Sequence, residues 1–146
     1  RMISKSHWIR TQSGPLLMDQ SYLQDIWSIL YGSRAQGDYH ASIAALLAAM
    51  FRHTQPMILF LELAPDLSAV RVAERDSGNS RLDHLPVEQV RDQLVEANWI
   101  PAQILKAVGK AGLPVKSLDA CDTTPNIAAK ALAAIAQNDF SGAELR

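Results

Sequence analysis

The fold expected for this chain is organised around the stretch PVEQVRDQLVEANWIPAQILKAVGKAG, from Pro86 to Gly112. Apolar residues recur at helical spacing on both sides of Asn98, which predicts two helices joined by a tight turn. Asparagine tolerates the left-handed conformation that ends many helices. Pro86 and Pro101 each suit the first turn of a helix, and Gly112 ends the second helix. The segment is therefore expected to form a helical hairpin.

Composition indicates an ordinary folded protein. The chain has 146 residues, of which 48% are hydrophobic and 20% are charged, as in globular domains. A net charge of -1 provides no general attraction to nucleic acid or to an anionic membrane, so either kind of binding would need a local patch. The single cysteine, Cys121, excludes an internal disulfide framework. With no long apolar run present, these features favour a cytoplasmic protein that does not bind a membrane.

Three more helices are expected outside the hairpin. Residues 22–31 carry a broad apolar stripe at helical spacing. A second helix is expected over residues 38–53, and because residues 41–51 are apolar except for one serine, it should be buried on most sides. The last helix is expected over residues 126–137, after Thr124-Pro125, which pairs a capping residue with a proline suited to the first helical position.

A small antiparallel sheet is expected among these helices. Residues 57–61 form an unbroken apolar run, which is typical of a buried strand. Residues 69–75 alternate between apolar and polar side chains, and a turn over residues 64–68 would pair the two segments as a β-hairpin with one exposed strand. Residues 81–85 are a candidate third strand. Residues 113–120 fit either a strand at the sheet edge or an extended connector.

The fold class expected is therefore α+β, with about five helices packed on a small antiparallel β-hairpin or three-stranded sheet. Residues 1–18 are expected to be a flexible N-terminal arm. Residues 19–146 are expected to form a single globular domain, because no repeat or linker composition divides them.

The hairpin resembles the helix-turn-helix class of DNA-binding motif between Val95 and Val108. The residues that match the spacing of that motif are the small Ala97, the turn residue Asn98, Trp99, which is expected to be buried, and Ala102 and Ile104 inside the second helix. Two positions depart from it: Ile100 stands where the motif usually has a polar cap, and Asn98 replaces the usual glycine. The resemblance implies a DNA-binding regulator.

Residues 97–118 contain three lysines and no acidic residue. Lys106 and Lys110 share one face of the second helix, and Gln103 near the start of that helix is a candidate for contact with a base edge. The predicted nucleic-acid-binding residues are Gln103, Lys106, Lys110 and Lys116. The alternative is a structural hairpin with a solvated lysine face, whose acidic first helix would repel a duplex.

Cys121 is the one candidate nucleophile. It lies just before the last helix, whose N-terminus would lower the pKa of the thiol, while Asp119 and Asp122 would raise it again. No pair of histidines has the spacing of metal ligands, and no phosphate-binding loop or nucleophile elbow is present. The sequence therefore predicts no catalytic residue, no cofactor and no metal site.

These observations favour a small cytoplasmic, non-catalytic protein-interaction domain, such as an adaptor, a chaperone-like factor or a regulator. The Ala-rich helices and the exposed strand expected over residues 69–75 favour a homodimer, with a protein partner or a second copy as the binding partner. A helix-turn-helix DNA-binding regulator using residues 86–112 is the first alternative. An enzyme using Cys121 is the second.

Overall fold

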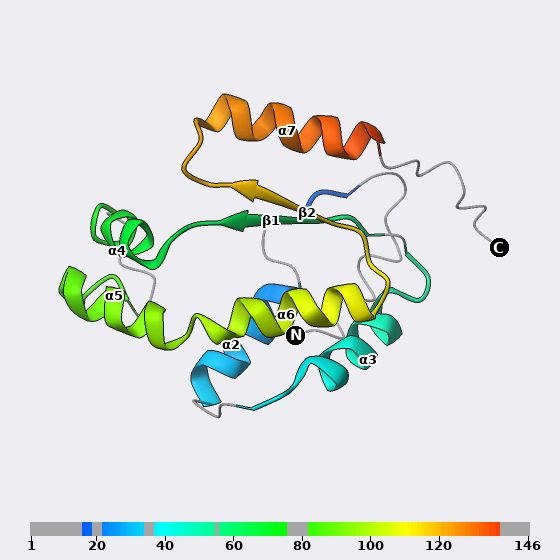
Figure 1. The fold of residues 1–146 in the computed structure, drawn as a ribbon, viewed down its shortest axis with the longest axis horizontal. Coiled ribbons are helices and arrows are strands. Elements are labelled where there is room, and N and C mark those ends of the chain that lie inside the picture. The colour runs from blue at the N-terminus through cyan, green and yellow to red at the C-terminus, as the bar shows by residue number, and fades with distance from the viewer. Residues whose placement is uncertain (1–15, 19–21, 34–36, 55, 76–81, 138–146) are drawn as a thin grey trace. The chain divides into compact units, whose positions relative to one another are not determined.

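The computed structural model contains helices and a small two-stranded sheet, as expected for the α+β class (Figure 1). The structure describes residues 16–18, 22–33, 37–54, 56–75 and 82–137. The helices are α2 Tyr22–Ser33, α3 His40–Phe51, α4 Pro65–Ala73, α5 Val87–Glu96, α6 Trp99–Lys110 and α7 Thr124–Gln137. The strands are β1 Ile58–Glu62 and β2 Val115–Asp119. Most of the N-terminal arm expected over residues 1–18 lies outside the described residues.

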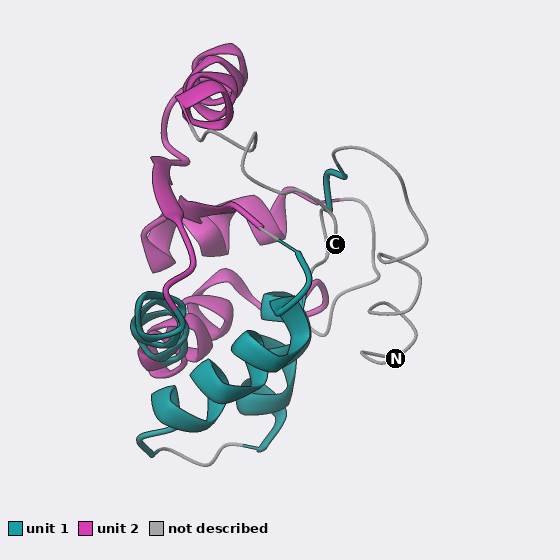
Figure 2. Ribbon diagram, turned by 90° about the vertical axis from the view of Figure 1, so that its right-hand side faces the viewer, with its two compact units in different colours: residues 1–54, 100–111 teal, residues 55–99, 112–146 magenta. Residues whose placement is uncertain are grey.

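The chain divides into two compact units, each assembled from separate stretches of sequence (Figure 2). The units cover residues 1–54 with 100–111, and residues 55–99 with 112–146. The first unit holds α2, α3 and nearly all of α6, and the second holds both strands with α4, α5 and α7. The boundary before Ile100 therefore separates α5 from α6, the two helices of the expected hairpin. A single globular domain over residues 19–146 stays a prediction.

Helix α2 buries the stripe that its sequence predicts. Tyr22, Ile26 and Leu30, four residues apart, are all buried. Tyr22 meets Phe51 at the end of α3 edge to face, with the ring centroids 5.3 Å apart. Aromatic pairs favour this geometry because the positive edge of one ring faces the negative face of the other. Helix α6 adds a buried stripe of its own, consisting of Ile100, Ile104, Ala107 and Val108.

Helix α3 is less enclosed than its composition predicts. Its buried residues are Ile43, Ala44 and Leu47. Leu46 is 41% exposed, and the alanines beside it are exposed as well. The expectation that this helix is buried on most sides is therefore wrong, because neighbouring elements of the structure cover only one stripe of it.

The sheet conflicts with the expected antiparallel hairpin. Strands β1 and β2 pair in parallel, in a register that runs from Ile58 opposite Val115 to Glu62 opposite Asp119. Parallel neighbours need a crossover connection, and here the chain between the two strands forms helices. Of the two alternatives for residues 113–120, the strand is confirmed, since β2 occupies residues 115–119 and pairs with β1.

Helix α4 replaces the second strand of the expected hairpin. Pro65 and Asp66 open this helix rather than forming a turn, as both suit a first helical turn. Ala69 and Val72, three residues apart, are its buried residues. Over so short a segment the same apolar residues fit either period. Residues 69–75 therefore offer no exposed strand edge through which two copies could pair.

The remaining connections are local. Residues 82–85 form a turn, in which the Leu85 N–H donates to the Leu82 carbonyl at 3.1 Å, so the candidate third strand is wrong over these residues. Within the second unit α5 packs on α4, and α7 packs on β2.

None of the described helices is both long and apolar enough to span a bilayer.

Candidate functional site

Gln103 lies on α6, and its side chain reaches the start of α3. Its Oε1 accepts hydrogen bonds from the backbone N–H groups of Tyr39, at 3.2 Å, and His40, at 3.1 Å. Tyr39 occupies the N-cap position of α3 and supplies no capping hydrogen bond of its own. Gln103 therefore satisfies two N–H groups that have no partner inside the helix. The oxygen expected to read a base edge is engaged in holding α3.

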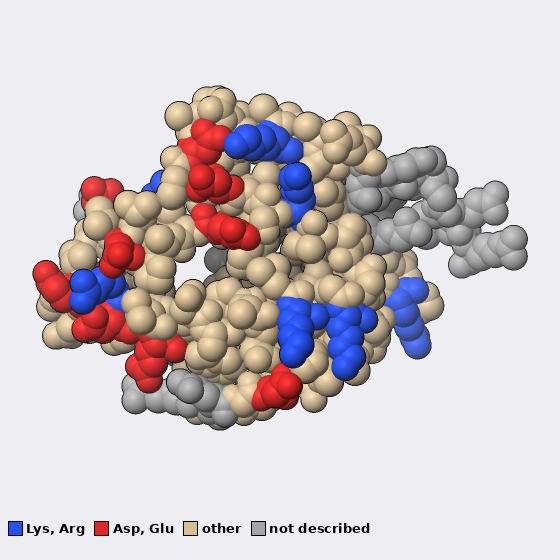
Figure 3. All heavy atoms as spheres, in the orientation of Figure 1, with Lys and Arg blue, Asp and Glu red and all other residues tan. Residues whose placement is uncertain are grey.

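Lys106 and Lys110 are exposed on α6, and Figure 3 shows basic side chains standing over the C-terminal half of this helix. Asp38, just before α3, lies close enough to Lys106 for the lysine charge to affect the pKa of its carboxyl group. A hydrogen bond with the His40 side chain lowers the pKa of Asp38, and the nearby charges of His40 and Lys106 lower it further. Part of the positive field of Lys106 is thus offset by an aspartate.

The four predicted nucleic-acid-binding residues are distributed over both units. Gln103, Lys106 and Lys110 belong to the first unit, whereas Lys116 lies on β2 in the second. The structure brings the first three together on one helix. Lys116 instead belongs to the surroundings of β2 and α7.

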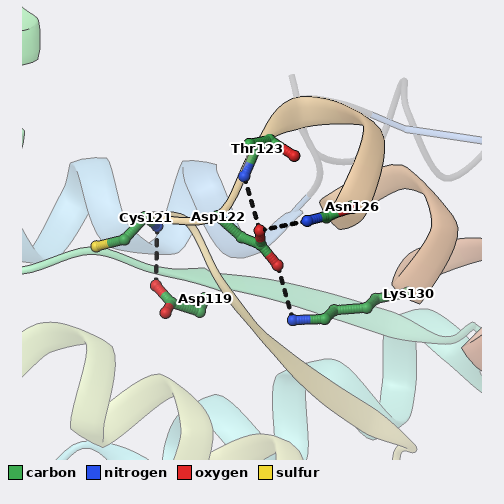
Figure 4. Close-up of polar contacts among 6 residues, drawn as sticks. All are labelled: Asp119, Cys121, Asp122, Thr123, Asn126 and Lys130. Atoms are coloured by element: carbon green, nitrogen blue, oxygen red, sulfur yellow. Dashed lines mark hydrogen bonds and ion pairs between the residues drawn. The ribbon is translucent and has the colours of Figure 1, made fainter.

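The junction between β2 and α7 is organised around the Asp122 carboxylate (Figure 4). Its Oδ1 accepts hydrogen bonds from the Thr123 N–H at 2.8 Å and from Asn126 Nδ2 at 2.9 Å. Its Oδ2 accepts one from Lys130 Nζ, also at 2.8 Å. These bonds, of which that from Lys130 has the largest effect, lower the pKa of Asp122 to about 2. The hydrogen bond and ion pair with Asp122 in turn raise the pKa of Lys130. The network fixes the first turns of α7.

Cys121 lies beside this network with its side chain exposed. Its backbone N–H donates to Asp119 Oδ1 at 2.8 Å. A hydrogen bond between the thiol and Asp119, followed by desolvation and the charge of that carboxylate, raises the pKa of Cys121, while Arg71 acts weakly in the other direction. The predicted direction is confirmed for Asp119. Because only the thiolate is a strong nucleophile, a raised pKa makes this cysteine poorly reactive at neutral pH.

A depression of about 370 Å³ lies between β2 and α7. Residues 116–119 of β2 form one side, and Lys130, Ala134 and Gln137 are among the α7 residues that form the other. The sequence did not predict this depression, because it depends on two contacts that leave no local pattern. Helix α7 packs on β2, and β2 pairs with β1, which lies more than fifty residues earlier in the chain. The one sequence signal for the depression is the succession of a short strand and an Ala-rich helix.

Comparison with models of known families, with curated proteins and with solved structures finds no match for this chain. In the part of the chain that the structure describes, no group of three or more His, Cys, Asp or Glu side chains is placed to hold a metal ion.

Proposed function

We propose that this chain is a non-catalytic protein-interaction domain that associates with a second copy of itself through α3. The observation that supports the proposal is the exposed face of this helix. Ala45, Leu46, Ala48 and Ala49 are all exposed, and no residue of α3 carries a formal charge apart from a protonated His40. An exposed helix face of this kind, without the charged residues that normally cover the solvent side, is typical of a contact surface.

A two-fold contact between copies of α3 is physically reasonable. Such a contact uses the same surface patch on both partners, so each side chain that the contact buries is buried once in each copy. Fully burying one leucine side chain contributes roughly 1.5–3 kcal/mol, and Leu46 is 41% exposed in the single chain. The small alanines around it permit close approach of two helices. A cytoplasmic location belongs to the same proposal.

Light scattering on the full chain, from micromolar to near-millimolar concentration, tests this proposal. We expect a mass that rises towards twice that of one chain, and we expect Leu46→Lys to restore the single-chain mass. Leu132→Lys is the matched control, because Leu132 is 66% exposed on α7, a helix of the other unit. A chain that stays single at every concentration would refute the proposal, as would association lost in the α7 variant and kept in the α3 variant.

DNA binding by the α5 and α6 region remains a second candidate, favoured by the exposure of Lys106 and Lys110 on one helix face. The engagement of Gln103 with α3 counts against base reading by that residue. Binding to random duplex DNA at low salt, lost when both lysines are changed to glutamate, would support it. No binding at low salt would remove it. The enzyme alternative loses support from the raised pKa of Cys121.

A further inference from the structure

We propose that the outer edge of β2, in the depression beside α7, binds an extended peptide segment that places an acidic residue opposite Lys116. This inference concerns a second surface, in the other unit, and so goes beyond self-association through α3. It depends on the proposed function only in the premise that the chain works through protein contacts. The partner is defined by backbone shape and charge.

The hydrogen bonds at the two ends of the sheet show which peptide groups of β2 face outward. The Ile58 N–H donates to the Pro114 carbonyl, and the Ala120 N–H donates to the Glu62 carbonyl, both at 2.9 Å. In a parallel ladder alternate residues of a strand bond to the same neighbour. Residues 114, 116, 118 and 120 therefore point their peptide groups towards β1, and Val115, Ser117 and Asp119 point theirs to the opposite edge.

No third strand covers this edge among the described residues, since the sheet that the structure describes has two strands. Unpaired strand edges readily accept a strand from another chain. Parallel sheets are normally larger than two strands, and an isolated pair of strands is only marginally stable. A bound segment would extend the ladder to three strands.

Helix α7 forms one side of the depression beside this strand edge. Figure 1 shows α7 running along β2, with β1 on the other side of the strand. Ala133 and Ala134 line the depression on the helix side, so the wall near the strand consists of small side chains. Gln137 at the end of the wall offers an amide for a side-chain hydrogen bond. A segment in extended conformation would pair with the strand edge and lie beside this helix.

The charged side chains of the depression determine which peptide segment would bind there. Lys116 and Lys130 line the depression together with Asp119. Lys130 is paired with Asp122. Asp119 accepts a hydrogen bond from the Cys121 N–H but keeps its negative charge, so an acidic side chain fits at the Lys116 end of the edge and not beside Asp119. Lys116 is exposed and forms no ion pair within the described part of the chain. Opposite charges that face each other across neighbouring strands stabilise a sheet by roughly 0.2–1 kcal/mol, which favours a carboxylate in the incoming segment.

Fluorescence anisotropy with labelled peptides tests the inference on the full chain. The probe is a peptide of alternating valine and glutamate, and the two controls are a valine–lysine peptide and the first peptide with a central proline. We expect only the first to bind well. Lys116→Glu should weaken its binding by about five- to tenfold and improve that of the valine–lysine peptide. Ser117→Pro removes an outward N–H without breaking the bonds to β1, and should also weaken binding.

The site itself is checked by NMR, where binding of the valine–glutamate peptide should shift the amide resonances of Val115, Ser117 and Asp119. Equal binding of the acidic and basic peptides, or shifts confined to other residues, would overturn the inference, as would no binding at all. If Ser117→Pro does not fold, the charge reversal at Lys116 still decides the outcome. A chain that dimerises but binds no peptide loses this inference and keeps the proposed function; the monomeric Leu46→Lys chain should still bind the peptide.

Discussion

Replacing Gln103 with methionine should loosen the start of α3. Methionine keeps the length of the side chain but has no oxygen to accept the N–H groups of Tyr39 and His40. Tyr39 supplies no capping side chain to α3, so the neighbouring Asp38 carboxylate, which also interacts with the His40 backbone, is the local acceptor that stays. The matched control is Gln103→Glu, which keeps the acceptor.

The magnitude follows from the two hydrogen bonds. Each is worth about 0.5–1.5 kcal/mol net, and loss of a helix cap typically costs about 1 kcal/mol. The site is only partly buried, so water can replace some of the lost bonding. We therefore expect Gln103→Met to lower the free energy of unfolding by about 1–2 kcal/mol. Gln103→Glu should stay within about 0.5 kcal/mol of the parent, because a negative charge is favoured at a helix N-terminus while nearby Asp38 opposes it.

Two measurements check this expectation. Urea denaturation gives the free energy of unfolding, and hydrogen exchange gives the protection of the Tyr39 and His40 amides, which should fall by about tenfold for 1.4 kcal/mol of local destabilisation. The reasoning is refuted if Gln103→Met leaves both the stability and the two amides unchanged. A methionine variant with unchanged stability but altered DNA binding would instead favour a base-reading role for Gln103.

The polar groups around β2 and α7 yield two further predictions. Asp122 has a pKa of about 2 in the folded chain against a usual value of 3.8, so its stabilising contribution should be complete above about pH 4 and lost as the pH falls through about 2. An NMR titration of its carboxyl group measures this pKa, and Lys130→Met should raise it; an unchanged value would contradict the assigned cause. Asp119→Asn should lower the pKa of Cys121 and speed its alkylation at pH 8, so equal rates in both proteins would show that Asp119 does not control the thiol.

Local sequence signals predicted most of the helices. Helices α2, α3, α5, α6 and α7 follow from apolar spacing, and prolines mark the starts of the last three, because both signals act within a few residues of chain. The same reasoning failed over residues 65–73, where the segment is too short to separate the helical period from the strand period. The upward effect of Asp119 on the pKa of Cys121 was also predictable, because Asp119 is its close neighbour in sequence.

An α+β chain, with two prominent helices around Asn98 and a lysine-bearing face on the second, could be predicted from local patterns of residues. The pairing of β1, the exposed face of α3, and the capping by Gln103 of a helix more than sixty residues earlier became visible only in the folded chain. These features depend on contacts between residues far apart in sequence, and such contacts leave no local period or spacing to read.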